Sequence, residues 1–110
     1  MGWAMLEFGA IAFALAAMMA TPASAAQPSF DCDTARSEVE KMICNDDALA
    51  DLDQRLARDF SKALARASAD QVPELRAAQR AWRTQMLKCA KEPDPRGCTL
   101  DAYTRRIDQL

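Results

Sequence analysis

Residues 45–67, NDDALADLDQRLARDFSKALARA, carry the clearest structural signal in this 110-residue sequence. The apolar side chains that recur there at steps of three and four are Leu49, Leu52, Leu56, Phe60, Ala63, Leu64 and Ala67. This spacing places them on one face of an α-helix. Asn45, Asp46 and Asp47 precede the stripe with side chains that cap the first amides of a helix. The stretch therefore predicts an amphipathic helix of about 20 residues.

Three weaker helical signals flank this stretch. Ser37 followed by Glu40 has the spacing of a capping box and predicts a short helix from about Glu38 to Cys44. Pro73 fits the first turn of a third helix. The buried stripe expected for that helix is Leu75, Ala78, Trp82, Met86 and Cys89 or Ala90. Residues 92–97, EPDPRG, predict a stiff turn that ends it.

A fourth helix is expected from about Cys98 to Leu110. The apolar residues on one side of it are Leu100, Tyr103, Ile107 and Leu110. No alternation typical of a β-strand extends beyond three residues. The predicted fold class is therefore all-α, a small bundle of about three to four helices.

The N-terminal segment has the pattern of an export signal. Phe8 to Ala20 is an apolar run of 13 residues, too short to span a bilayer, although no Lys or Arg precedes it. Ala23-Ser24-Ala25 has the small residues of a signal-peptidase site. The alternative is a membrane anchor. We expect residues 1–25 to be a signal peptide and residues 26–110 to be a single periplasmic or secreted helical domain without a membrane span.

Export determines how the four cysteines are interpreted. Cys32, Cys44, Cys89 and Cys98 all follow the predicted cleavage site, and in an oxidising compartment they predict two disulfides. Zinc is the alternative, but there is no C-x2-C pair and no histidine. Three connectivities are possible. Loop closure favours the local pairs Cys32–Cys44 and Cys89–Cys98, each worth roughly 3 kcal/mol in the chain-entropy model.

Composition argues against catalysis and cofactor binding. The absence of histidine removes the usual general base and the commonest metal ligand. With three glycines there is no Gly-rich phosphate loop. Asp51 and Asp53 are two residues apart on a helix, so they point to different sides and do not form the facing pair that glycoside hydrolysis needs. We expect no catalytic residue, no metal site and no cofactor.

Charge is divided along the chain. Residues 26–60 contain nine acidic and four basic residues, whereas residues 61–110 contain six acidic and ten basic ones. The simplest interpretation is solvated helix faces with a few inter-helix pairs. The alternatives are an acidic face for a basic partner, or a basic face that meets an anionic polymer. The small net charge and few aromatic residues argue against nucleic acid.

Several polar residues stand next to apolar positions, and a polar group in a core needs a partner. From these residues we expect a structural polar network of Glu40, Asp53, Gln79 and Arg106 that orients the helices, with Arg106 paired to an acid. Trp82 is expected to pack in the core rather than to act as a ligand platform.

Two segments together resemble a known family. The first contains residues 30–32 (FDC), 37–44 (SEVEKMIC) and 49–56 (LADLDQRL). The second contains residues 79–82 (QRAW), then Cys89, Cys98, Tyr103 and residues 106–107 (RI). The combined pattern resembles the LprI-type lysozyme-inhibitor domain family over nearly all of residues 26–110. The resemblance implies a small exported helical domain of the bacterial envelope, with inhibition of lysozyme as its expected activity.

The expected partner is therefore a protein, a lysozyme-like muramidase whose sugar-binding cleft the domain occludes. Because animal lysozymes are typically basic, an acidic face would speed encounter and fix orientation. The partner-binding candidates are Asp46, Asp47, Asp51 and Arg96. The alternative is a non-catalytic envelope scaffold that binds a resident periplasmic protein through the basic face of the third helix, without effect on lysozyme.

Overall fold

The computed structural model describes residues 26–110, together with the isolated residues 2, 9, 12 and 14. The signal peptide predicted for residues 1–25 lies outside the described residues, apart from those four positions. The elements of residues 26–110 are η1 (Cys32–Thr34), α1 (Glu38–Cys44), α2 (Asp47–Arg66), α3 (Gln71–Leu87), η2 (Lys88–Lys91) and α4 (Pro95–Gln109), where η marks a 3-10 helix. The predicted all-α class is thus confirmed for the part of the chain that the structure describes.

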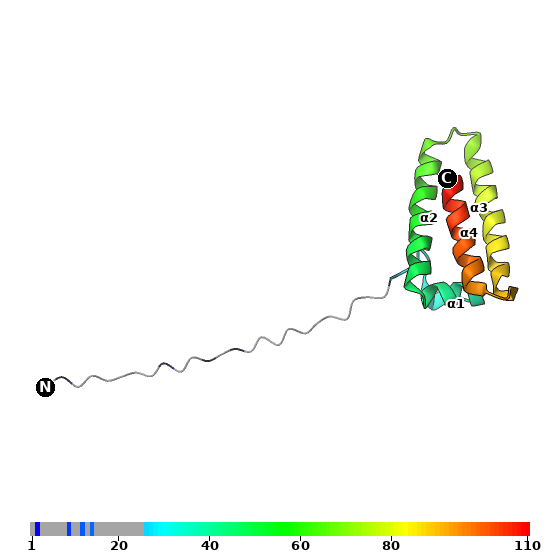
Figure 1. The fold of residues 1–110 in the computed structure, drawn as a ribbon. Helices are drawn as coiled ribbons and strands as arrows, with labels where there is room; N and C mark the ends of the chain where they lie inside the picture. The colour runs from blue at the N-terminus through cyan, green and yellow to red at the C-terminus, as the bar shows by residue number, and fades with distance from the viewer. Residues whose placement is uncertain (1, 3–8, 10–11, 13, 15–25) are drawn as a thin grey trace.

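The bundle consists of three helices side by side and one across their end. Figure 1 shows α2, α3 and α4 running alongside one another, with α1 lying across the end where α2 begins. The connection between α2 and α3 lies at the opposite end, near the end of α4. No helix in residues 26–110 has both the length and the apolar character needed to cross a membrane.

The first two α-helices begin where the sequence predicts. The Glu40 N–H donates to Ser37 Oγ over 3.0 Å, which caps α1. The Leu49 N–H donates to Asp46 Oδ1 over 3.2 Å, which caps α2. Both contacts satisfy amide groups that have no carbonyl partner within their helix.

The predicted start of the fourth helix is wrong by three residues. α4 begins at Pro95 rather than at Cys98. Pro95 occupies the first turn, where no amide N–H is required, and the Gly97 N–H donates to Asp94 Oδ1 over 2.9 Å. A side chain at position 97 would collide with the Asp94 carboxylate, so glycine there permits the cap. The segment predicted as a turn therefore contains the start of a helix.

The core is formed by the inner faces of all four α-helices and by η2. Its buried residues are Val39, Ile43, Leu49, Ala50, Leu56, Met86, Cys89, Tyr103 and Ile107. Two predicted stripe positions are wrong: Ala78 is exposed and Leu100 is 36% exposed. The buried face of α4 is instead Thr99, Tyr103, Arg106 and Ile107, one position away from Leu100.

Two disulfides staple the fold, as predicted. Cys32–Cys44 joins η1 to the end of α1, with 5.9 Å between the Cα atoms. Cys89–Cys98 joins η2 to the first turns of α4, with 5.5 Å between the Cα atoms. Cys89 thus lies in a separate 3-10 turn after α3 rather than in the third helix itself. Both disulfides close short loops at the end of the bundle that α1 covers (Figure 1).

Candidate functional site

A half-open cleft of about 240 Å³ lies among α1, α2, α3, α4 and the segment before η1. Phe30, Phe60, Trp82 and Tyr103 line it with aromatic rings. The rings of Trp82 and Tyr103 meet edge to face, with centroids 5.0 Å apart and planes at 77°. Such T-shaped pairs are favourable because the positive ring edge faces the negative ring face. We call this hollow the polar cleft, because its aromatic lining surrounds charged groups.

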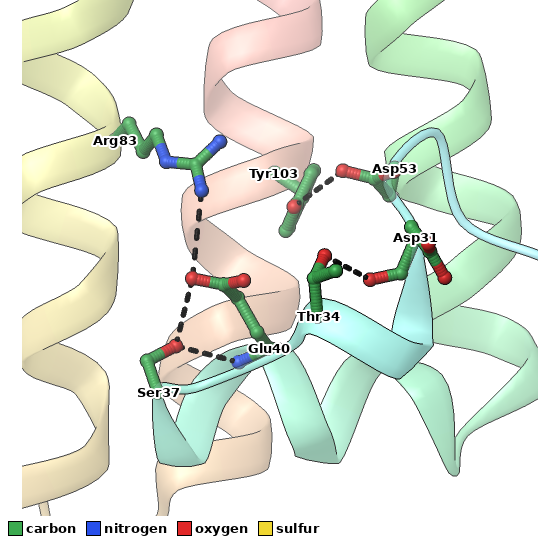
Figure 2. A network of polar contacts seen from close by, with 7 residues as sticks. All are labelled: Asp31, Thr34, Ser37, Glu40, Asp53, Arg83 and Tyr103. Carbon is green, nitrogen blue, oxygen red and sulfur yellow. Dashed lines mark hydrogen bonds and ion pairs between the residues drawn. The ribbon is translucent and has the colours of Figure 1, made fainter.

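Asp53 supplies the deepest carboxylate of the polar cleft. It is 7% exposed, and its Oδ1 accepts a 2.7 Å hydrogen bond from the Tyr103 hydroxyl (Figure 2). Its Oδ2 accepts hydrogen bonds from the Ser29 N–H and, over 2.6 Å, from Ser29 Oγ. These three donors replace the water that a buried carboxylate loses. No ion pair among the described residues includes Asp53.

The environment of Asp53 also controls Tyr103. Burial raises the pKa of the Tyr103 hydroxyl well above its usual range, and the negative charge and hydrogen bond of Asp53 raise it further. The neutral phenol therefore remains the donor to Asp53 across the physiological range. This contact joins α2 to α4, and the Ser29 contacts attach the segment before η1 to the same carboxylate.

Glu40 and Arg83 form the outer part of the polar cleft. Figure 2 shows the Arg83 guanidinium of α3 pointing toward the Glu40 carboxylate of α1. Glu40 Oε1 accepts hydrogen bonds from Arg83 Nη2 over 3.4 Å and from Ser37 Oγ over 3.2 Å. The Glu40 side chain is 18% exposed, whereas that of Arg83 is 55% exposed. Arg83 is therefore the solvent-exposed partner at the rim, while Glu40 lies further inside the cleft.

Arg106 lies behind the polar cleft and forms a second polar group. Its Nε donates to Gln79 Oε1 over 2.8 Å and its Nη1 donates to Gln109 Oε1 over 3.1 Å. Arg106 is 8% exposed, and its Nη2 is buried without a hydrogen-bond partner among the described residues. The acid expected from the sequence is thus replaced by two amide oxygens.

The predicted network residues divide into two groups in the structure. Glu40, Asp53 and Gln79 line the polar cleft, and Gln79 also reaches Arg106, which does not line the cleft. Asp53 and Glu40 are not hydrogen-bonded to each other; each is tied to a different helix, through Tyr103 and Arg83 respectively.

The four residues proposed for partner binding lie at the start of α2 and α4. Asp46 Oδ2 accepts a 2.7 Å hydrogen bond from Arg96 Nε, so two of them neutralise each other. The Arg96 hydrogen bond and the Leu49 N–H lower the pKa of the Asp46 carboxyl. Asp47 is exposed and its Oδ1 accepts from the Ala26 N–H over 3.1 Å. Asp51 is exposed.

Exposed carboxylates gather around α1 and the start of α2. We call this surface the acidic end and define it by its exposed residues Asp31, Asp33, Glu38, Asp47 and Asp51. The acidic end lies opposite the connection between α2 and α3 (Figure 1). Its negative charge is partly offset by the exposed bases Arg36 and Lys41 and by Lys88 and Lys91 of η2, which lies at the same end of the bundle.

Sequence reasoning missed Arg83 and Ser29 as members of the polar cleft, and it placed Tyr103 only on an apolar stripe. Their contacts join residues 24 to 50 positions apart, so no local spacing identifies them. For Tyr103 there is a weak signal, since a hydroxyl on a buried helix face needs a partner. In residues 26–110, no group of three or more His, Cys, Asp or Glu is placed to hold a metal.

Comparison with known proteins places this fold in a family. Residues 32–110 match the family described as "Lysozyme inhibitor LprI". Proteins named "Lipoprotein LprI" from Mycobacterium bovis and from two strains of Mycobacterium tuberculosis are each 38% identical over 91 residues. That alignment covers 82% of this chain but 44% of each relative, so the chain spans less than half their length. No solved structure matches. The matched residues include both disulfides and all four α-helices, and the chain belongs to the LprI family.

Proposed function

We propose that residues 26–110 form an exported domain that binds a lysozyme-type muramidase and inhibits it by occluding its substrate cleft. The observation that carries this proposal is the extent of the family match, which covers residues 32–110 and hence the whole disulfide-stapled bundle. In this proposal residues 1–25 direct export to the periplasm or beyond, and the domain acts as a binding module without catalysis.

A rigid surface favours inhibition by occlusion. The two disulfides hold η1, α1, η2 and the start of α4 together at the end of the bundle that bears the acidic end. A surface fixed before binding loses little conformational entropy in the complex. The acidic end complements a basic muramidase and accelerates encounter by electrostatic attraction.

Asp47 and Asp51 of the acidic end are better placed for this attraction than the neighbouring Asp46, which is not part of it. Asp46 caps α2 and pairs with Arg96, so its charge is largely compensated within the domain. Asp47 and Asp51 are exposed, and no ion pair of the described residues contains either of them. We therefore retain Asp47 and Asp51 as partner-binding residues and assign Asp46 and Arg96 to the support of that surface.

The test measures binding of the oxidised protein to several classes of lysozyme at two salt concentrations. The double variant Asp47→Asn/Asp51→Asn keeps side-chain size and the oxygen that accepts from Ala26. We expect its association rate to fall about three- to tenfold at low salt and to depend less on salt, because exposed interface charges act mainly on association.

A matched control removes the same charge elsewhere. Asp70 precedes α3 and Asp108 lies in the last turn of α4, both exposed at the end opposite the acidic end. Asp70→Asn/Asp108→Asn is expected to bind like the unmodified protein. Equal losses in both double variants would show that only net charge matters. Absence of binding to every lysozyme, with retention of a periplasmic protein instead, would favour the envelope-scaffold alternative.

A further inference from the structure

The polar cleft has the size of a side-chain receptor. Its volume of about 240 Å³ lies below the roughly 300–1,000 Å³ of pockets that enclose whole small molecules. It is open on one side and closed by Ile43, Leu56 and Met86 among its other walls. Its occupant is therefore a single projecting group rather than a free metabolite of ordinary size.

The charges of the polar cleft select a cation. The charged residues that line it are Glu40, Asp53 and Arg83, which leave one net negative charge. Asp53 is buried and its three hydrogen-bond donors are neutral groups. Reduced access of solvent strengthens the attraction of these carboxylates for an incoming positive charge. An anionic group would face two carboxylates against one guanidinium, and a purely apolar group would leave Asp53 without a cationic partner.

The aromatic lining of the cleft favours a guanidinium over an ammonium group as the bound cation. Phe30, Phe60, Trp82 and Tyr103 line the same cleft as the two carboxylates. A planar guanidinium stacks on such rings while it donates to carboxylate oxygens, which a compact ammonium does less well. The chain's own Arg83 already places a guanidinium 3.4 Å from Glu40 at the rim, and its side chain is 55% exposed.

We propose that the polar cleft receives one arginine side chain of the partner protein, which displaces Arg83 from Glu40 and lies between Glu40 and Asp53. This inference rests on the proposed function and adds to it the chemistry of one anchoring contact. Arginine in a concave site is a common energetic anchor of protein interfaces. The contact involves other residues than the exposed carboxylates of the acidic end, which attract the partner over longer distances.

A direct titration tests the receptor without any lysozyme. The probes are N-acetyl-arginine amide, which carries one positive charge, and N-acetyl-citrulline amide, its neutral isostere. We expect the arginine probe to shift the NMR signal of the Trp82 indole N–H with an affinity on the order of millimolar, and the citrulline probe to have no effect. The Trp82 indole reports on the cleft because its ring lines the cleft, and its N–H donates a 3.1 Å hydrogen bond to the Ala102 carbonyl.

Two substitutions are expected to act in opposite directions. Glu40→Gln keeps the shape of the side chain and should weaken both probe binding and lysozyme binding about tenfold or more, the size of a lost charge-assisted hydrogen bond. Arg83→Gln frees Glu40 and should strengthen probe binding. The matched controls are Glu74→Gln and Arg80→Gln on α3, exposed residues that neither line the cleft nor belong to the acidic end, and they should change neither probe binding nor lysozyme binding.

The probe titration and the lysozyme-binding measurements together distinguish failure of the arginine receptor from failure of the proposed function. Lysozyme binding that survives Glu40→Gln unchanged, with the folded variant verified by circular dichroism, overturns the arginine receptor and leaves the inhibitor function standing. If the unmodified protein binds no lysozyme, the proposed function is refuted. The probe titration then tests by itself whether the cleft binds arginine. Equal shifts by the arginine and citrulline probes, or none by either, overturn the receptor.

Discussion

Asp53 and Tyr103 connect α2 and α4 through one buried hydrogen bond of 2.7 Å. The donor is the protonated phenol, whose pKa is raised by burial and by the Asp53 charge. A group with a raised pKa in the folded state stabilises the fold fully below its unfolded pKa, which is about 10 for tyrosine. That stabilisation is lost as the pH rises above this value toward the folded pKa.

Alkaline titration should show the raised pKa of Tyr103 directly, because Tyr103 is the only tyrosine of the sequence. We expect tyrosinate absorbance to remain absent near pH 10 in the folded protein and to develop together with loss of helical circular dichroism. Tyr103→Phe should lose about 1–3 kcal/mol of unfolding free energy in urea at pH 7, since Asp53 Oδ1 is left without this donor. Ordinary titration of the tyrosine near pH 10 in a fully helical protein would contradict the burial of this contact.

Arg106 presents a contrasting case of a buried charge with no carboxylate partner within residues 26–110. Its Nη2 has no hydrogen-bond partner among the described residues, and its other contacts are the amide oxygens of Gln79 and Gln109. Removing a hydrogen-bonding partner from a buried charge destabilises more than replacing the charge itself. Arg106→Met should therefore change stability little or increase it, whereas Gln79→Ala should decrease it by about 1–3 kcal/mol.

Urea unfolding of Arg106→Met and Gln79→Ala tests which variant loses more unfolding free energy. The control is Gln85→Ala, an exposed residue of α3 whose side chain has no hydrogen bond in the described structure. A larger loss in Arg106→Met than in Gln79→Ala would mean that the guanidinium has a stabilising partner that these contacts do not include.

At the scale of elements, the disulfides stabilise the short elements η1, α1 and η2. η1 and α1 have three and seven residues, too few to be stable as isolated helices. Cys32–Cys44 ties them together, and Cys89–Cys98 ties η2 to α4. Replacing either pair by serines should lower the unfolding free energy by about 3 kcal/mol, from the loop entropy of the unfolded chain.

Peptide mapping without reductant checks the pairing, and chemical unfolding of the two double-serine variants checks its energy. The Cys32/Cys44 variant should also loosen Ser29 and Phe30, which precede η1 and contact the polar cleft. Faster amide exchange is expected in that segment but not at the start of α4. Equal exchange in both regions would contradict a local role for this disulfide.

The helices were predictable where their signals are local. Ser37 with Glu40, and Asp46 with the apolar stripe of α2, fix two helix starts within a few residues of sequence. Asp94 and Pro95 give an equally local signal, but the neighbouring Pro93 and Gly97 also favour a turn, so the helix start was misplaced. The polar cleft was not predictable, because Ser29, Asp53 and Tyr103 meet only after three separate segments have packed.

At the scale of the whole molecule, the division of charge has a spatial counterpart. The acidic half of the chain forms η1, α1 and most of α2, and its exposed carboxylates form the acidic end. The buried Asp53 and the partly buried Glu40 of the same half line the polar cleft. The same half of the chain thus supplies the exposed carboxylates of the acidic end and both carboxylates of the polar cleft, which suits a basic protein partner.

Steady-state kinetics of a lysozyme with a soluble oligosaccharide substrate tests the occlusion of the substrate cleft most directly. The oxidised protein is titrated at fixed enzyme concentration, and its fold is verified by helical circular dichroism. Occlusion predicts that KM rises in proportion to free inhibitor while kcat stays constant. A fall in kcat at unchanged KM, or no inhibition of any lysozyme by the folded protein, would contradict it.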